Sequence, residues 1–446
     1  MYQTKRGLDL PILGAPAQKI VSAPPIKTAA VLGPDYHGMK PTMKVQVGDS
    51  VKVGSPLFVD KKNEGVVHTS PVAGKVTQIN RGHKRALLSV VISISGSDYV
   101  SFEKQAASSL GSLGKEKAQD FLVKTGLWTR LRTRPFSRTP KLNTTPSSLF
   151  VNCMDTNPLA PDMAVVSAGR QEDFKNGLEL LGQLVPTIYC CTAKGMESMV
   201  PKAHKVQTKV FAGPHPSGLA GTHIHFVDPV GKEKTVWTIG YQDVVAIGKT
   251  ITTGKLANTR IISVAGPRVK NPCLMEVPVG ACLQEVTKGN IEGDNNRIVS
   301  GSVLSGHTAS EAMCYLGMFH QQVSVLLEGT EREFLGWQRP GFEKFSVKNI
   351  FASKLTPKKR FSFTTSTEGS VRAMVPVGSY EKVMPLDIEP TFLLRALFTQ
   401  DTEQSQLLGV LELDEEDLSL CTYVCPTKEE YGPLLRESLT RIEKDG

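Results

Sequence analysis

The sequence predicts an α/β protein built from several domains. Its 446 residues are too many for one hydrophobic core, and a chain of this length usually holds about three domains. Two patterns indicate the class. Apolar and polar residues alternate between glycine-containing turns early in the chain, and strand-like runs alternate with helical periods in the middle. Apolar residues at helical spacing return near the end, so we expect a helical C-terminal domain.

Residues 40–96 predict paired short strands. Residues 43–58 alternate apolar and polar side chains and break at Gly48 and Gly54, and residues 69–79 form a second half of the same kind. Two such halves resemble a barrel-sandwich domain of the biotinyl/lipoyl type. We therefore expect residues 1–100 to hold an N-terminal segment and a barrel-sandwich domain.

Lys61 and Lys62 fall near the place where carrier domains of this type hold a modified lysine. One hypothesis is a swinging arm, and the other is a solvated hairpin on a domain reused for structure. The loop is longer than a carrier hairpin, and the rest of the chain has no lipoyl-using chemistry. We therefore predict that both lysines are unmodified.

Residues 101–255 predict a Rossmann-like domain. Helical periods occur at residues 115–125, where Gly126 is placed to end the helix, and at residues 171–184. Short apolar runs predict strands at residues 148–152, 186–191 and 205–211. Because strands alternate with helices, we expect a parallel sheet.

The last part of the chain predicts three further units. Residues 256–330 predict a small β-grasp (SLBB-like) domain, since their short strands are punctuated by Gly and Pro. Residues 331–375 predict connecting strands, and residues 376–446 a helical domain. Two apolar helix faces support the helical domain, Leu393, Leu394, Leu397 and Phe398, and Leu434, Leu435, Leu439 and Ile442.

Composition argues against several classes of protein. The formal charge is +9, but the basic residues are scattered without an RNA- or DNA-binding signature, so no nucleic-acid partner is predicted. No stretch approaches the roughly 18 apolar residues that span a bilayer, and residues 1–10 lack the apolar run of a signal peptide. We expect a cytoplasmic protein that contacts a membrane only through partner subunits. The eight cysteines show no disulfide pattern and should be reduced.

Several long segments make the chain similar to a known family. They are residues 5–11, 126–129, 132–137, 155–160, 213–223, 298–306, 380–385 and 411–417. Together with the order of the predicted domains, they resemble the A subunit of the Na⁺-translocating NADH:quinone reductase over nearly the whole chain. The C subunit of the Rnf electron-transport complex and the flavoprotein subunit of respiratory complex I resemble it more distantly.

The resemblance implies a peripheral subunit on the cytoplasmic face of the bacterial inner membrane, bound to the other subunits of a six-subunit complex. That complex couples NADH oxidation and ubiquinone reduction to Na⁺ export, and NADH is oxidised on a different subunit. The chain would act in the step from ubisemiquinone to ubiquinol and would not be catalytic alone. Two alternatives are a cofactor-free docking subunit without substrate contact and a stand-alone NADH–flavin oxidoreductase.

The chain departs from the distant relatives where they bind redox cofactors. In them a loop of several glycines lets flavin phosphate approach the backbone, whereas residues 128–137 here contain no glycine. Iron–sulfur clusters need four thiolates at tight spacing, and only Cys421 and Cys425 occur in the matching stretch. We therefore predict no tightly bound flavin, cluster or metal, with ubiquinone as the substrate of the complex.

Three histidines, His215, His223 and His225, lie close together in the sequence. If His223 and His225 lie on a strand, both rings point to one face, which is a geometry that metals use. The surrounding glycines favour the alternative of a loop packed against another domain. The sequence assigns the three rings no role.

A quinone needs an apolar aromatic slot and one or two donors to its carbonyls. Tyr36 and Phe136 would form the slot, and His37 or the tyrosine hydroxyl would donate. Arg132 and Arg134, together with Arg130, would add positive potential that favours the semiquinone. Tyr36, His37, Arg132, Arg134 and Phe136 are the predicted quinone site, and the sequence identifies no catalytic residue.

Overall fold

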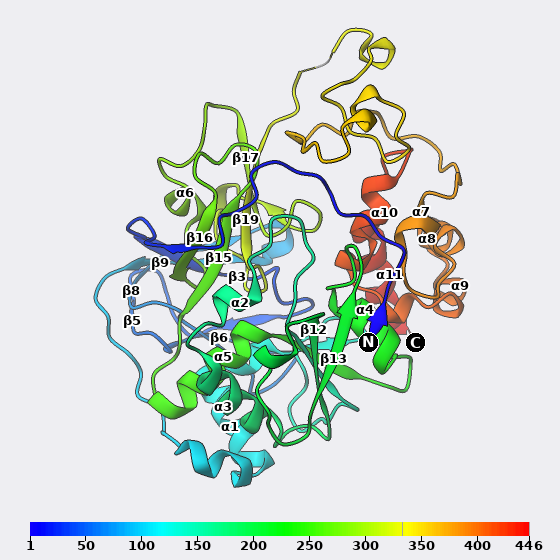
Figure 1. Cartoon of the computed structure of the whole chain (residues 1–446). Helices are drawn as coiled ribbons and strands as arrows, with labels where there is room; N and C mark the ends of the chain where they lie inside the picture. Colours follow the sequence, from blue (N-terminus) through cyan, green and yellow to red (C-terminus); the bar gives the residue numbers. More distant parts are fainter. Residues whose placement is uncertain (332, 446) are drawn as a thin grey trace.

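The computed structural model describes residues 1–331 and 333–445 and contains two six-stranded sheets, two smaller sheets and a group of C-terminal helices (Figure 1). The predicted α/β multidomain class is confirmed. The units follow one another along the chain, except that the first 21 residues cross three of them.

The predicted barrel-sandwich domain is confirmed. Its two sheets share one core, in which Leu57, Phe58 and Val90 are fully buried. One sheet has the order β3-β9-β8-β5 and the other β4-β6-β7. The strands are β3 (Thr28–Leu32), β4 (Pro41–Met43), β5 (Ser50–Val51), β6 (Pro56–Asp60), β7 (Val67–Thr69), β8 (Gly74–Arg81) and β9 (Leu87–Ile94).

The loop between β6 and β7 carries the two lysines and is tied down. Lys61 and Lys62 are exposed, but the Asp60 carboxylate accepts from the Lys62 amide at 2.9 Å. The Asn63 amide donates to the carbonyls of Thr139 and Pro140 at 3.2 and 2.9 Å. A loop fixed to the neighbouring domain supports the solvated hairpin over the swinging arm, and the unmodified state of the lysines stays a prediction.

The Rossmann-like domain follows as predicted. Its sheet has the order β1-β13-β12-β11-β14-β10, with every neighbouring pair parallel except β14 and β10. The strands are β1 (Tyr2–Gln3), β10 (Arg132–Arg134), β11 (Leu149–Asn152), β12 (Ile188–Ala193), β13 (Val206–Ala212) and β14 (Val236–Gly240). Local sequence patterns predicted β11, β12 and β13 but not the other three.

Helices cover both faces of this sheet. Leu149 and Val151 lie in the core with α1, α3 and α5, whereas Phe150 lies in the core with α4, because successive strand side chains point to opposite faces. The predicted helix at residues 115–125 is confirmed to the residue, and the second predicted helix ends at Leu181. The helices are α1 (Lys115–Thr125), α2 (Met163–Val166), α3 (Gln171–Leu181), α4 (Ala220–Val227) and α5 (Tyr241–Thr253).

The β-grasp domain has a mixed sheet of order β18-β17-β19-β15-β16-β2, in which β15 and β19 are parallel. Its strands are β2 (Ile20–Val21), β15 (Thr259–Ala265), β16 (Cys273–Pro278), β17 (Asn296–Ser300), β18 (His307–Thr308) and β19 (Gln322–Leu327), with the short helix α6 (Leu283–Val286). Since β1 extends one large sheet and β2 the other, the N-terminal segment ties the two domains together.

The connecting strands predicted for residues 331–375 are wrong. The described part of this range forms only two short 3₁₀ helices, η6 (Gly336–Gln338) and η7 (Ala352–Leu355), and isolated bridges from Phe361 and Thr364. Pro340, Gly341 and Pro357 interrupt the apolar positions between residues 334 and 361, which disfavours strands there.

The C-terminal helices are confirmed. Leu393, Leu394 and Leu397 are buried as predicted, whereas Phe398 is 37% exposed and only its edge meets Tyr431. In the described chain no helix is both long enough and apolar enough to cross a membrane. The helices are α7 (Tyr380–Val383), α8 (Pro390–Thr399), α9 (Thr402–Leu407), α10 (Ser419–Val424) and α11 (Tyr431–Asp445).

Helices α3 and α5 approach each other through two glycines. A Cβ added at Gly248 would lie 1.8 Å from the Asp173 carbonyl oxygen, and one at Gly177 would lie 2.0 Å from the Val244 carbonyl oxygen. Backbone cannot yield as a flexible side chain does, so these positions fix the spacing of the two helices.

We predict that Gly248→Ala lowers the free energy of unfolding by about 1–3 kcal/mol, because the added methyl group forces the helices apart. Urea denaturation followed by circular dichroism measures this change. The control is Gly231→Ala, where an added Cβ meets no atom within 4 Å. Equal effects of the two variants would show that the helix contact is not the cause.

Candidate functional site

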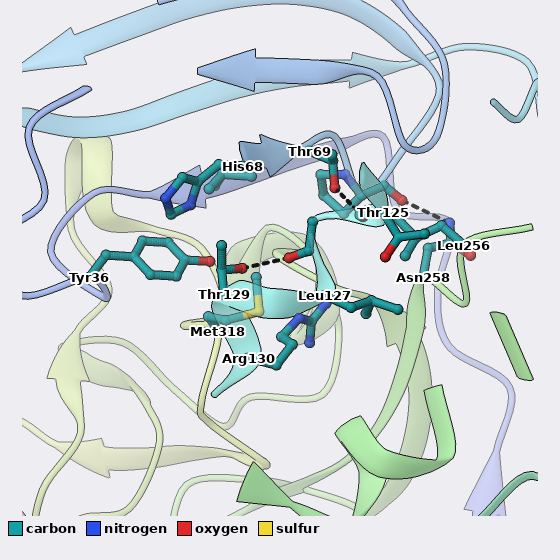
Figure 2. Close-up of a pocket in the computed structure, with 13 residues that line it drawn as sticks. Tyr36, His68, Thr69, Thr125, Leu127, Thr129, Arg130, Leu256, Asn258 and Met318 are labelled. Atoms are coloured by element: carbon teal, nitrogen blue, oxygen red, sulfur yellow. Dashed lines mark hydrogen bonds between the residues drawn. The ribbon is translucent and has the colours of Figure 1, made fainter. Parts of the chain in front are cut away.

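Tyr36 lies in a narrow pocket where three domains meet (Figure 2). The barrel-sandwich domain supplies Tyr36 and His68, the Rossmann-like domain supplies Thr129 and Arg130 from η3 (Leu127–Arg130), and the β-grasp domain supplies Met318. Figure 2 shows the Tyr36 hydroxyl pointing toward Thr129. The space open to a water-sized sphere is about 20 Å³, which is room for about one water molecule.

The rings beside Tyr36 are held by stacking. His68 lies flat on Phe58, with centroids 4.4 Å apart and planes 19° apart, and meets the edge of Tyr36 at 4.3 Å. Burial lowers the pKa of His68 to about 3, and its buried Nδ1 has no hydrogen-bond partner among the described residues. Burial also raises the pKa of Tyr36 above its ordinary value. At neutral pH both groups are therefore uncharged.

Charged groups lie in and beside this pocket, and sequence reasoning named only Arg130 among them. Asp243 accepts from Arg130 at 2.6 Å and from Arg260 at 2.5 Å, and all three side chains are buried. Beside Tyr36, the Asp35 carboxylate accepts from the Met318 amide at 2.7 Å, and burial raises its pKa to about 6. Sequence reasoning missed Asp35 although Tyr36 directly follows it, because only the fold buries it.

The predicted slot between Tyr36 and Phe136 is wrong. The Tyr36 ring contacts His68 and Phe319, whereas Phe136 packs against the apolar core of the C-terminal helices. The two residues are about a hundred positions apart in sequence, and no local pattern showed which partner each ring would find.

Arg132, Arg134 and His37 face an acidic turn, and Arg132 also lies over the Phe319 ring that meets Tyr36, 4.6 Å from its centroid. The turn, Asp414 with η9 (Glu415–Leu418), carries four successive carboxylates. His37 lies 3.7 Å from Glu415, and burial together with the charges of Arg436 and Arg132 lowers its pKa to about 3. A neutral ring at that place adds no charge to the turn.

Arg134 is the centre of this contact. Its guanidinium lies 3.0 Å from Asp417 and 3.3 Å from Asp414, and all three side chains are at most 3% exposed. Arg132 and Arg134 reach the same turn because residues two apart on strand β10 share one face. Arg436 of α11 adds contacts of 2.5 Å to Asp414 and Glu415.

The charges in this cluster offset one another. Burial acts to raise the pKa of Asp414, but the charges of Arg134 and Arg132 outweigh it and hold that pKa well below its ordinary value. Burial and the neighbouring Asp417 raise the pKa of Glu416 to about 7. Carboxylates therefore compensate the charges of Arg132 and Arg134, and this pairing does not favour their predicted role beside a semiquinone, which stays a prediction.

Gly221, the second residue of α4, is required by the contact between this helix and the acidic turn. A Cβ at Gly221 would lie 2.3 Å from the Asp417 carboxylate, so only glycine lets the acidic turn reach the start of this helix. The same turn thus packs on both β10 and α4.

His223 and His225 lie on α4, neither on the strand that a metal site would need nor in a loop, and positions two apart on a helix do not share a face. His223 pairs with the Ser217 carbonyl at 3.0 Å. His225 accepts from the Asp387 amide at 3.0 Å, which leaves Nδ1 to donate to Glu412 at 2.7 Å. Separate partners favour the packing interpretation for these rings.

One group of three possible metal ligands occurs among residues 1–331 and 333–445, and it consists of His37, Asp414 and Glu415. Arg436 already contacts both carboxylates, so its charge occupies the place of a cation.

Cys421 of α10 and Cys425, the residue directly after this helix, lie in the helical core. Three hydroxyls, those of Thr427, Tyr380 and Tyr431, surround the Cys425 sulfur at 3.1, 3.2 and 3.3 Å. Burial acts to raise the pKa of Cys425, but these hydrogen bonds lower it to about 7.

Comparison with known proteins decides the family. Three family models match: the NqrA N-terminal barrel-sandwich hybrid domain over residues 2–95, the NqrA second alpha/beta domain over 113–256, and the NQRA C-terminal domain over 261–311. The chain is 55% identical over 446 residues to the Na(+)-translocating NADH-quinone reductase A subunit of Pseudomonas aeruginosa strain UCBPP-PA14, with both chains covered completely. The chain belongs to this family.

Other relatives agree. The protein of the same name from Saccharophagus degradans is 54% identical over 447 residues, with complete coverage of both chains. Among solved structures, an NAD⁺-reducing [NiFe]-hydrogenase in the air-oxidised state is similar over 50% of this chain and 46% of its own, with 14% identity and a TM-score of 0.32.

We predict that Arg134→Ala lowers the free energy of unfolding by about 3–5 kcal/mol, because it leaves buried carboxylates without their cation. Urea unfolding measures the loss. The control is Arg441→Ala, whose surface pair with Glu437 is about 39% and 54% exposed and should contribute less than about 1 kcal/mol. A similar small loss in both variants would contradict the central place of Arg134.

We also predict that His68→Phe makes the protein less sensitive to acid. The pKa of His68 falls from 6.5 to about 3 on folding, so below 6.5 the unfolded chain binds more protons than the folded one. Between about pH 7 and about pH 5 this ring alone lowers the free energy of unfolding by about 2 kcal/mol. Urea unfolding at both pH values measures the difference, and the exposed His204→Phe is the control. If His68→Phe loses as much stability as wild type, the ring is not buried in its neutral form.

Proposed function

We propose that the chain is a peripheral subunit of a Na⁺-translocating NADH:quinone reductase, which couples NADH oxidation and ubiquinone reduction to Na⁺ export. The observation that carries this proposal is 55% identity, over the full length of both chains, to a protein with that printed name. The partners are the other subunits of a six-subunit complex, which hold the chain at the cytoplasmic face of the bacterial inner membrane. The chain itself holds no tightly bound cofactor.

Within the complex, the chain takes part in the step from ubisemiquinone to ubiquinol. That step adds one electron and two protons to the semiquinone anion, and the electron comes from cofactors on other subunits. This chain's contribution is to place donors and exclude water. The Tyr36 pocket supports that contribution, because hydroxyls of Tyr36 and Thr129 and the Arg130 cation converge among apolar side chains at a domain junction.

Tyr36 therefore remains in the proposed quinone site, with His68 and Met318 in place of the predicted Phe136. Of the three arginines predicted to add positive potential, Arg130 stays in the proposed site, whereas Arg132 and Arg134 pair with the acidic turn. Because the pocket has room for about one water molecule, the junction must open before a quinone ring can enter.

The alternative is a docking subunit without substrate contact. The narrowness of the pocket favours it, and so does the compensation of Arg130 by Asp243. In that case the quinone binds a partner subunit and this chain only holds the partner in place.

Titration of the purified chain with a short-chain, water-soluble ubiquinone, followed by tryptophan fluorescence, separates the two. If the chain contacts quinone, saturable quenching occurs, and Tyr36→Phe weakens it by about three- to tenfold through loss of one hydrogen bond. The control is Tyr189→Phe, which changes a tyrosine of strand β12 instead. Absence of saturable quenching would favour the docking alternative. Failure of the chain to purify with the membrane subunits would contradict the proposal itself.

A further inference from the structure

The segment of residues 333–377 carries an unusual share of the exposed apolar surface. Of the eighteen large apolar side chains exposed among the described residues, nine lie in this segment, which is about a tenth of the chain. Phe342, Ile350 and Leu355 are 61%, 70% and 76% exposed. Figure 1 shows the first part of the segment projecting away from the sheets. We call residues 333–377 the arm.

The base of the arm is fixed to the body. Phe345, Phe361 and Phe363 form a ring cluster with centroids 5.6–6.3 Å apart, and Phe363 continues to Tyr423 of α10 at 6.4 Å. The Phe361 amide donates to the Pro11 carbonyl at 2.7 Å. The apolar residues of the arm thus fall into two groups. Phe345, Phe361 and Phe363 pack against one another and the body, whereas Phe342, Ile350 and Leu355 are exposed to solvent.

The arm is also strongly basic. It holds eight Lys and Arg residues against three Glu, a net charge of +5 where the whole chain has +9. Glu333 pairs with Arg339 and Lys344, and Glu343 pairs with Lys359. Glu333 and Glu343 are therefore already paired with cations of the arm itself.

Several exposed cations of the arm remain uncompensated. No carboxylate of the described chain forms an ion pair with Lys348, Lys354 or Lys358, and all three are exposed. Unpaired cations next to exposed apolar side chains fit a surface that is apolar and ringed by carboxylates.

From these observations we infer that the arm docks on an apolar, acidic protein surface of another subunit in the same membrane complex. This inference rests on the proposed function. The arm holds half of the exposed large apolar side chains of the described residues, and permanent subunit interfaces are the more apolar kind.

Backbone chemistry selects protein over lipid as the partner. The described arm forms no strand and only the short 3₁₀ helices η6 and η7, so many of its amides and carbonyls lack regular partners. Irregular backbone does not enter the hydrocarbon region of a bilayer unless protein covers it. A protein surface can satisfy these groups while it buries Phe342, Ile350 and Leu355.

The test uses cells that express the full set of subunits, with an affinity tag on this chain. The membrane subunits recovered per tagged chain are measured after mild detergent extraction. We expect F342S/I350S/L355S and, separately, K348E/K354E/K358E to lower the recovery at least about tenfold, as for side chains at the centre of an interface. Both variants should keep the unfolding midpoint of the purified chain, because the changed side chains have no partner in the body.

Two matched controls change the same kind of residue elsewhere. V47S/L407S replaces exposed apolar side chains, and K61E/K62E/K117E reverses three exposed lysines away from the arm. Both should recover partner subunits as wild type does. Wild-type recovery by the two arm variants, or equal losses in the controls, would overturn the inference.

A lipid partner has its own outcome. If the isolated wild-type chain sediments with vesicles of anionic phosphatidylglycerol and the arm variants do not, the arm binds membrane and the inference is overturned. If wild type itself recovers no membrane subunits, the proposed function fails, which is a different result from the failure of the arm variants alone.

Discussion

The contact between Arg134 and the acidic turn is the constraint on which the arrangement of the domains depends. A guanidinium that is 2% exposed must keep its carboxylates, because removing either partner leaves an uncompensated charge away from water. Asp414 and Asp417 come from the far end of the chain, and Arg134 lies on the edge strand of the Rossmann-like sheet. If the C-terminal helices separated from that sheet, Arg134 would lose Asp414 and Asp417, and buried charges would be left exposed to water or without a partner.

This constraint also shapes the Tyr36 pocket. Strand β10 follows directly after Leu131, which succeeds η3, the element that supplies Thr129 and Arg130 to the pocket. Because the acidic turn holds β10 in place, and one residue separates β10 from η3, η3 can move only a short distance. The barrel-sandwich and β-grasp sides of the pocket, which supply Tyr36 and Met318, are joined by the hydrogen bond from the Met318 amide to Asp35, so a junction that opened between them would have to break this bond.

Local patterns predicted the parts of the fold that local physics determines. The helix at residues 115–125 has an apolar face and a left-handed glycine at its end, and both signals survive in the structure. Strand β10 could not be predicted, since two arginines in three residues are not a strand pattern. Its pairing with β14 and the carboxylates from the far end of the chain hold it there. The same holds for the candidate site. Tyr36, a residue of the predicted site, lines the pocket, but Phe136, Arg132 and Arg134 have partners far away in sequence, which no local pattern could identify.

Native-state hydrogen exchange tests the central claim that the Arg134 contact joins the C-terminal helices and the Rossmann-like sheet in one cooperative unit. The amides to compare are those of α11 and of β12 in the unmodified chain. We expect both sets to open with nearly the same free energy, because α11 cannot detach without uncovering Arg134. Opening of α11 at a free energy more than about 3 kcal/mol below that of β12 would contradict this claim, since the helices would then separate without the expected charge penalty.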